Sequence, residues 1–565
     1  MDDVKTLISR LALAQLRRRE FLKLAGLTAS SSVLAACVAA SPTGSASEGS
    51  TASEGTSSAP PQVLRYPMTN DATGNWDYTL SGGGFGLSMG LELMDGLTEL
   101  DVETGEPKPK VAESWEFTEE GAVCTFTLRD DVTWSDGTPV TAHDFEFAIK
   151  RNFDPASASQ YAWALYQIEG GEDYNTGVTT DPDTVGVTAL DDTHLEIRLR
   201  EPTPYLPMLT ALWVTYPLKR DLLESTGAEW WHPENAITNG PFRPESWEID
   251  QKWTIVRNEN YWGTMPTIER IEYTLFENDE TQGVAAYEAG ELDIAQVSAA
   301  DMERLSNDPE LSQQLHIWSR SANWQLRLDM SNAASPLADL NVRQALYLAI
   351  DRERLATNVL KGTMEPAWTF LPSGTMGYNP DARLQGTVDD AKQLMADAGY
   401  PDGAGFPGFK LVYVATQGDA TLMSQAIAGM WKENLGIDVE LVPAPNDWRT
   451  LIRTEPYDMY IGRWYADYED PQDWHNLALV EDSFSTHYAN QEWIDAVEAA
   501  KVELDVEKRR QMYEEAEVAL IADAPIIPLT YPSQIWLIKP NITGLVPRNL
   551  IGQPSYRQAQ VEALP

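Results

Sequence analysis

Hydrophobic and polar positions alternate along most of the chain in patterns that predict both helices and strands. Residues 188–200 hold an Asp-Asp turn followed by alternating apolar positions, which predicts a β-hairpin. Residues 410–415 and 437–442 have the pattern of buried strands. The intervening residues 421–434 have the pattern of a helix that ends before Gly436. A strand, a helix and a strand in this order predict a parallel pair and therefore an α/β domain.

Further patterns extend this interpretation along the chain. Residues 342–350 have helical spacing with Asn341 as the expected N-cap, and residues 389–398 predict another helix. One or two helices are expected between 491 and 522, and residues 526–531 predict a final apolar strand. The absence of a short-period repeat in the sequence disfavours solenoids and propellers.

The first 37 residues have the pattern of an export signal. The pair Arg18-Arg19 precedes an apolar run over 24–35, which is shorter than the ~20 residues of a membrane-spanning helix. The pair resembles a twin-arginine export signal, and residues 34–37 (Leu-Ala-Ala-Cys) resemble the lipobox of bacterial lipoproteins, where the cysteine is lipidated. Residues 38–61 are almost entirely small or polar, which predicts a disordered linker. We therefore expect an exported protein that Cys37 anchors outside the cytoplasmic membrane.

Composition narrows the classes of partner. The net charge of −45 argues against nucleic acid, because phosphate binding requires a clustered basic surface. With Cys37 assigned to a lipid, Cys124 has no disulfide partner, and its place in the apolar segment 123–128 predicts a small buried residue. The remaining length of about 500 residues predicts several domains with ample core.

Motifs of covalent chemistry are missing from the sequence. Its six histidines show no HExxH spacing, and it has no cysteine cluster, GxSxG elbow or GxxxxGK[ST] loop. We therefore expect no metal, no cofactor and no enzymatic activity. The glycines at 82–86 lack the strand-then-helix context of a dinucleotide fingerprint and predict a flexible loop, with backbone approach to a ligand as the alternative. A glycosidase carboxylate pair cannot be singled out among so many acids.

Aromatic residues are abundant, with 19 tryptophans and 22 tyrosines. Large rings with a polar edge suit clefts that hold peptides or sugars, although each ring taken alone is expected to be a packing residue. Those in polar, turn-rich stretches are Trp230, Trp231, Trp262, Trp368, Trp448, Trp464, Tyr465, Tyr468 and Trp474.

Seven motif blocks occur in order between Asp95 and Pro471. The blocks lie at 95–98 with 111–115 (DGLT, VAESW), 125–144 (TFTLRDDVTWSDGTPVTAHD), 239–242 (NGPF), 257–262 (RNENYW), 342–352, 391–400 and 466–471 (ADYEDP). Together they resemble the large solute-binding proteins of bacterial ABC importers in the oligopeptide and dipeptide class, extracellular solute-binding family 5.

The resemblance implies a periplasmic-binding-protein type II-like fold, in which two α/β lobes close on a ligand about a hinge. Lobe I would comprise 62–105, 238–325 and 532–565, an extra inserted domain 106–237, and lobe II 326–531. It also implies a monomer that delivers its ligand to ABC permease subunits in the membrane.

The resemblance places the ligand site in residues 463–468. In peptide-binding relatives, the aspartate that matches Asp467 pairs with the α-ammonium of the ligand, which is reasonable because a desolvated cation needs a fixed carboxylate. Trp464 and Tyr465 would line the pocket. The alternative is that Asp467 only caps the turn before Pro471. Further ligand-binding candidates are Arg463, Tyr468, Trp368, Phe85 and Trp324, the last at the expected hinge.

One departure bears on the ligand. Dipeptide-binding relatives carry an arginine after the strand that matches 411–415, whereas residues 416–419 here are Thr-Gln-Gly-Asp. A plain dipeptide is therefore disfavoured, and an oligopeptide is the leading ligand. Oligosaccharides remain open within the same fold. An exported hydrolase of peptides or glycans and a ligand-presenting sensor subunit are the alternatives outside transport.

Overall fold

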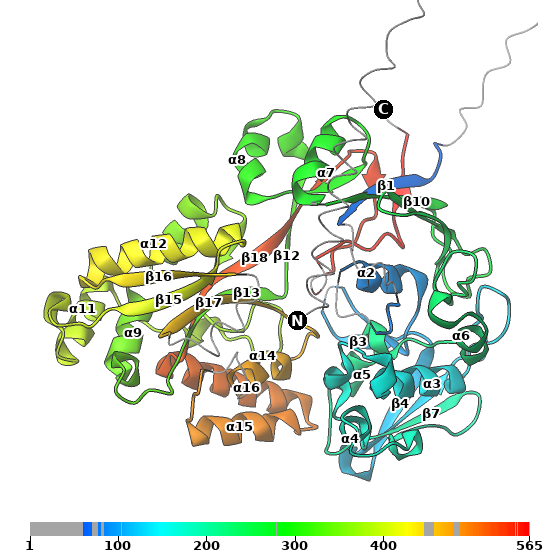
Figure 1. Ribbon diagram of the computed structural model, residues 1–565, viewed down its shortest axis with the longest axis horizontal. Coiled ribbons are helices and arrows are strands. Elements are labelled where there is room, and N and C mark those ends of the chain that lie inside the picture. The colour runs from blue at the N-terminus through cyan, green and yellow to red at the C-terminus, as the bar shows by residue number, and fades with distance from the viewer. Residues whose placement is uncertain are drawn as a thin grey trace, which may run out of the picture. The chain divides into compact units, whose positions relative to one another are not determined.

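The computed structural model describes residues 60–69, 77–80, 84–102, 104–277, 279–445, 457–479, 486–548, 550 and 552–563. The leader, Cys37 and most of the linker lie outside the described residues. Helices and strands are both present throughout residues 60–563, as Figure 1 shows, so the α/β fold class is confirmed.

A four-stranded sheet forms from segments assigned to lobe I. Its strands, in spatial order, are β1 (Val63–Thr69), β10 (Arg270–Phe276), β9 (Lys252–Arg257) and β8 (Phe242–Glu248). β1 runs parallel to β10, and the other neighbours are antiparallel. Ile271, Tyr273 and Leu275 alternate with half-buried positions along β10, so one face of the sheet is packed on a core.

A second four-stranded sheet lies wholly within the segment 106–237. Its order is β4 (Ala112–Thr118), β5 (Val123–Leu128), β7 (His194–Arg198) and β6 (Val187–Ala189), all antiparallel. The hairpin predicted over 188–200 is confirmed as β6 and β7. Cys124 on β5 is fully buried, as predicted, and burial raises the pKa of its thiol to about 12.

The largest sheet has β11 (Ile294–Gln296), β18 (Ile526–Ile538), β13 (Ala322–Leu328), β17 (Met459–Tyr465), β15 (Phe409–Val414) and β16 (Val439–Ala444) in spatial order. β12 (Leu315–Ser319) and β14 (Met364–Pro366) also pair with β18. β15 and β16 are parallel and are joined by α12 (Gly418–Leu435), which confirms the predicted strand–helix–strand unit. α12 ends at Gly436, whose φ of 72° is the left-handed conformation that favours glycine.

Two strands of this sheet cross the boundaries expected between the lobes. The predicted strand 526–531 continues as β18 to Ile538, where it pairs with β11 and β12 after pairing with β13. β13 begins three residues after β12 ends and passes through the expected boundary at 325. Both expected boundaries therefore fall inside continuous strands.

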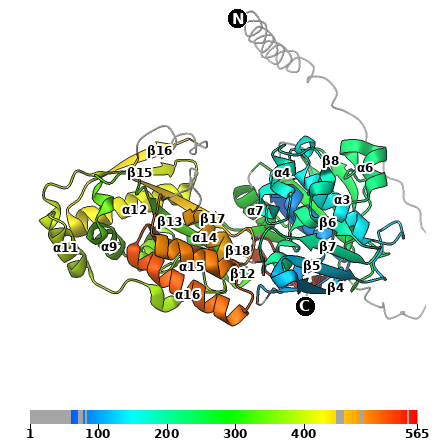
Figure 2. The same ribbon diagram turned by 90° about the horizontal axis from the view of Figure 1, so that it is seen from below.

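Helices cover the sheets. Helix α12 covers one face of the largest sheet, and α15 and α16 pack on each other at the opposite side (Figures 1 and 2). In the described residues, the bounds of these two helices and of the remaining ones are α2 (Gly84–Leu93), α3 (Ala142–Phe153), α4 (Gly171–Asn175), α5 (Leu206–Leu209), α6 (Arg220–Thr226), α7 (Asp279–Glu288), α8 (Ala299–Asn307), α9 (Leu340–Leu348), α10 (Arg352–Arg354), α11 (Val388–Asp397), α14 (Pro471–Leu479), α15 (Gln491–Lys501) and α16 (Val506–Asp523). Short strand pairs are β2 (Thr98–Leu100) with β3 (Pro107–Pro109) and β19 (Ile542–Thr543) with β20 (Gln560–Val561).

Two local predictions were wrong. The N-cap of α9 is Asp339, whose carboxylate accepts a hydrogen bond of 2.9 Å from the backbone N–H of Asn341. Residues 84–86 form the first turn of α2 instead of a loop, because the helix that continues to Leu93 already begins at Gly84; residues 82 and 83 of the predicted loop lie outside the described residues.

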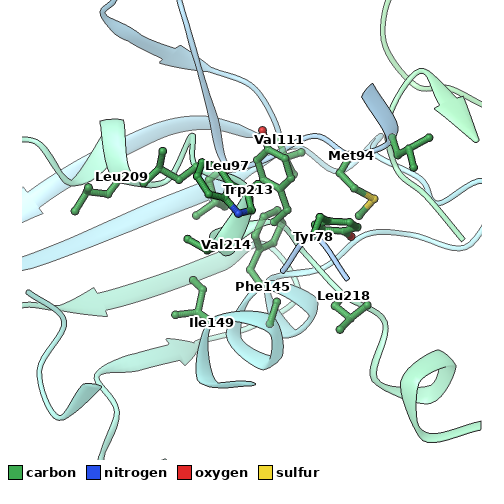
Figure 3. Close-up of a cluster of buried hydrophobic side chains, with 14 of the residues drawn as sticks. Tyr78, Met94, Leu97, Val111, Phe145, Ile149, Leu209, Trp213, Val214 and Leu218 are labelled. Atoms are coloured by element: carbon green, nitrogen blue, oxygen red, sulfur yellow. The ribbon is translucent and has the colours of Figure 1, made fainter. Parts of the chain in front are cut away.

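The segments assigned to lobe I and to the extra domain share one hydrophobic core. Met94 and Leu97 from the first pack with Phe145, Ile149 and Trp213 from the second (Figure 3). A separate cluster fills the core under the largest sheet. Within the described ranges, no helix has the length and apolar character needed to cross a membrane.

Candidate functional site

A cavity of about 800 Å³ is lined by segments that are far apart in the sequence. They are residues of α2 and after it up to Lys110, Tyr161 with residues between Ala211 and Tyr216, residues between Pro241 and Thr264, Arg320, residues 465–467 with Glu469, and residues between Val546 and Gln558. The volume is within the range of small-ligand sites. Because the expected lobe I, extra domain and lobe II all contribute, a ligand here would touch each of them.

Asp467 lies in the wall of this cavity, just after β17 ends. Its Oδ1 accepts a hydrogen bond of 2.8 Å from the phenol of Tyr161. Its Oδ2 is covered by neighbouring atoms and has no hydrogen-bond partner among the described residues. Burial raises the pKa of the carboxyl to about 6, against a smaller opposing effect of the Tyr161 hydrogen bond. A buried carboxylate that lacks a cation is a strong attractor for a positively charged ligand group.

Asp473, in the first turn of α14, holds the loop that carries Asp467. Its Oδ2 accepts hydrogen bonds from the indole N–H of Trp464 at 2.9 Å and from the backbone N–H of Asp467 at 3.1 Å. Burial, followed by the nearby charge of Asp467, raises the pKa of Asp473 well above its ordinary value. Trp464 therefore supports the loop through Asp473, and it does not line the cavity.

A buried ion pair fixes the turn between these two aspartates. Asp470 receives two hydrogen bonds from the guanidinium of Arg509, at 2.6 and 2.7 Å, and both side chains are almost fully buried. Tyr205 and Tyr468 are stacked with ring centroids 5.9 Å apart, and Tyr205 also contacts Arg509. Tyr468 is thus a buried packing residue that contacts Tyr205.

Tyr465 and Arg320 both line the cavity and contact each other. The guanidinium carbon of Arg320 lies 3.9 Å from the centroid of the Tyr465 ring, and that of Arg463 lies 4.9 Å from it. Arg463 is exposed beside this ring and does not line the cavity itself. Of the predicted stretch 463–468, the structure therefore brings Tyr465 and Asp467 to the cavity, together with Ala466.

The remaining candidates lie elsewhere. Trp324 is fully buried on β13, and Trp368 lines a separate cavity of about 280 Å³ with Tyr378, Arg383 and Tyr531. Phe85 belongs to α2, but its side chain lies outside what the structure describes, as do Trp448 and Cys37. Among the described tryptophans, Trp213 alone lines the larger cavity. The tryptophan surplus thus gives oligosaccharide binding little support.

Several lining residues were not anticipated from the sequence. Tyr161 and Trp213 come from the segment expected to form the extra domain, and Glu469 follows Asp467 by two residues. On the facing wall, Asp95 pairs with Arg557 at 2.5 Å and accepts a hydrogen bond of 2.8 Å from Tyr261. No sequence signal marks Tyr161 or Trp213, whereas the position of Glu469 beside Asp467 would have allowed its prediction.

A cavity of this size, with an acidic side chain in its wall, has the features of a small-ligand binding site. The described residues contain no group of three or more His, Cys, Asp or Glu side chains placed to hold a metal ion. The model of the bacterial extracellular solute-binding proteins, family 5 (Middle), matches residues 106–484. The chain belongs to this family, and the resemblance seen in its motifs is confirmed.

Relatives of known name cover most of the chain. The oligopeptide-binding protein OppA of Bacillus subtilis is 30% identical over 478 residues, which are 80% of this chain and 85% of that protein. The murein tripeptide-binding protein MppA in its unliganded open form has a TM-score of 0.78 at 30% identity, over 89% of this chain and 98% of that one. Haemophilus influenzae OppA in complex with the peptide RPPGFSPFR has a TM-score of 0.69 at 27% identity, over 89% and 99% of the two chains. The expected periplasmic-binding-protein type of fold is thereby confirmed.

Proposed function

We propose that the protein is the extracytoplasmic substrate-binding component of an ABC importer, which captures oligopeptides and delivers them to a membrane permease. The observation that carries the proposal is the Asp467 carboxylate, buried in the cavity wall with one oxygen unpaired. The names of the relatives, which are oligopeptide- and murein peptide-binding proteins, support it.

The α-ammonium of a peptide has the charge and the hydrogen-bond donors that Asp467 lacks in the free protein. A charge-assisted hydrogen bond of this kind contributes about 1.5–3 kcal/mol, which is roughly a 10- to 100-fold change in affinity. Tyr161 would keep Asp467 oriented during capture, because its phenol already donates to Oδ1. Trp213 and Tyr465 would contact the body of the peptide.

Capture by closure follows from the way the segments are connected. We assign lobe I to 62–105, 238–325 and 532–565, the extra domain to 106–237, and lobe II to 326–531. On this assignment, β13 and β18 carry the chain between the lobes, so small dihedral changes there would act as a hinge. A ligand that touches both lobes binds the closed state better and shifts the population toward it.

The export signal in residues 1–37 bears on where the protein would capture its ligand. We propose that the paired arginines and the lipobox-like end direct export and lipidation of Cys37, and that residues 38–61 tether the protein as a monomer near its permease. Replacing Cys37 by alanine should abolish incorporation of a radiolabelled fatty acid and release the protein from the membrane fraction. Continued labelling of that variant would contradict the anchor.

The peptide proposal is tested by calorimetry with free and N-acetylated forms of the same tripeptides. Acetylation should weaken binding to the wild type at least tenfold, and Asp467→Asn should weaken binding of the free peptides and abolish the effect of acetylation. Glu492→Gln, an exposed acid on α15 of the same lobe, serves as the control. Equal binding of free and acetylated peptides would refute the role of Asp467, and cleavage of the peptides on incubation would refute a pure binding function.

A further inference from the structure

Glu469 is a second carboxylate in the wall of the same cavity, and its side chain is half-buried. Its Oε1 accepts a hydrogen bond of 2.5 Å from the hydroxyl of Ser321, which fixes the side chain. Gly105, whose φ is 73°, packs against its stem, and a β-carbon at position 105 would lie in ordinary van der Waals contact with that of Glu469, at 3.5 Å. Burial raises the pKa of this carboxyl, and Ser321 opposes the effect. The Ser321 hydrogen bond and the Gly105 contact therefore fix the position of Glu469.

The acids of the facing wall, Asp95 and Glu99, differ from Asp467 and Glu469 because they have basic partners. Asp95 pairs with Arg557 and lies 3.7 Å from Lys110, and Glu99 lies 3.2 Å from Lys110. In contrast, no described basic side chain forms an ion pair with Asp467 or Glu469, and burial is the first cause of the raised pKa of each. The uncompensated negative charge of the cavity is thus concentrated at two positions that are two residues apart.

Asp467 and Glu469 lie in one wall without an ion-pair partner among the described residues, so two positive charges on a ligand would neutralise them. A buried charge without a partner is costly, and a ligand with two cations would compensate both. A divalent metal ion is disfavoured here, because the described residues hold no third acid or histidine placed to complete a coordination site. The α-carbons of residues 467 and 469 are at most about 7 Å apart, since two residues of extended chain span no more than that.

We propose that Glu469 forms a second cation subsite, so that the preferred ligands are peptides whose first residue is lysine or arginine. The inference rests on the proposed function, in which Asp467 holds the α-ammonium. The ammonium or guanidinium of the first side chain then pairs with Glu469, and both charges belong to one residue of the ligand. Ser321 orients Glu469 for this contact, and the loop at Gly105 shields it from water.

The experiment compares Lys-Ala-Ala with norleucine-Ala-Ala by isothermal titration calorimetry on the wild-type protein. The two peptides have the same length, an α-ammonium group and an unbranched first side chain of four carbon atoms, and they differ in the charge of that side chain. The wild type should bind the lysine peptide roughly 10- to 100-fold more tightly, the effect of one charge-assisted hydrogen bond in a buried site. Equal affinities for the two peptides would overturn the inference and leave the proposed function standing.

Variants of the protein test whether Glu469 causes the preference for the lysine peptide. Glu469→Gln should reduce the ratio of the two affinities to near one and leave binding of the norleucine peptide within about threefold, which also shows that the variant is folded. Asp467→Asn should weaken both peptides, and Glu492→Gln should preserve the wild-type ratio. A preference that survives Glu469→Gln would overturn the assignment. Failure of both peptides to bind the wild type would overturn the inference together with the proposed function.

Discussion

Replacing Asp467 by asparagine should stabilise the ligand-free protein while it weakens ligand binding. The pKa of Asp467 is about 6 in the folded protein, against an ordinary value of 3.8. A difference of about two pH units corresponds to roughly 3 kcal/mol that the ionised carboxyl costs the folded state. Asparagine keeps an oxygen to accept the hydrogen bond from Tyr161, and it carries no charge.

The sign and the pH window follow from the direction of this pKa. Because the folded state raises the pKa, its protonated form is favoured, and the cost of ionisation is complete above about pH 6. The cost decreases as the pH falls through 6 toward 4. The gain from Asp467→Asn should therefore be at most about 3 kcal/mol at pH 7.5 and about half of that at pH 5. The amide N–H group lowers the gain where it finds no acceptor.

The assay is urea unfolding of the ligand-free protein at both pH values, followed by tryptophan fluorescence. Asp495→Asn is the matched control, because Asp495 is exposed on α15 and does not line the cavity. Its unfolding midpoint should stay close to that of the wild type. The reasoning fails if Asp467→Asn lowers the midpoint at pH 7.5, or if its effect is larger at pH 5 than at pH 7.5.

Three further outcomes are expected. Affinity for a peptide ammonium should fall about tenfold between pH 7 and pH 5, because a carboxyl of pKa about 6 changes from mostly ionised to mostly protonated; a flat calorimetric profile would contradict the role of Asp467. Arg509→Met should destabilise the protein by about 3–5 kcal/mol in urea unfolding, since it leaves the buried Asp470 carboxylate without its partner, and a loss below 1 kcal/mol would contradict this account. Gly436→Ala should lower the free energy of unfolding by at least about 1–2 kcal/mol because the φ of Gly436 is positive. Gly429→Ala should raise it by up to about 1 kcal/mol, because Gly429 lies on the exposed face of α12 with open space around it. The opposite order of unfolding midpoints would be inconsistent with the structure.

Local patterns sufficed to predict the elements whose signals agree with one another. The unit formed by β15, α12 and β16 has apolar strands, a long helix and Gly436 at the helix end, so the prediction matches the structure closely. The N-cap of α9 was misplaced because Asp339 and Asn341 are both good caps. The choice between them depends on the turn at Pro336–Ala338 that precedes the helix.

The C-terminal half of β18 was missed because its residues do not alternate. Pro532, Ser533 and Gln534 interrupt the apolar run after Tyr531, so the pattern indicates the end of a strand. In the structure, this half lies between β11 and β12 in the interior of the sheet, and most of its side chains are buried on either face. Burial on both faces removes the period-two signal on which strand prediction depends.

The site was only partly accessible from the sequence for a related reason. Asp467 could be proposed because it lies in a motif, whereas Tyr161, which orients it, is 306 residues away and follows no pattern. The chain has 86 acidic residues, and neither composition nor spacing separates those that bind from those that pack.

The presence or absence of an ion-pair partner distinguishes a candidate binding acid from one that only packs. Asp470 is as deeply buried as any acid of the site, yet Arg509 neutralises it, so it can contribute to structure and cannot attract a ligand. Asp467 and Glu469 lie one residue to either side of Tyr468 on the same loop, and each accepts a hydrogen bond from a hydroxyl group, whereas no basic side chain in the described part of the chain forms an ion pair with either. On the proposed function, a cationic ligand would remove the electrostatic cost of these two carboxylates, and the removal of this cost would become part of the binding free energy. A loop that placed arginines beside all three acids would be more stable and would have nothing with which to hold an ammonium group.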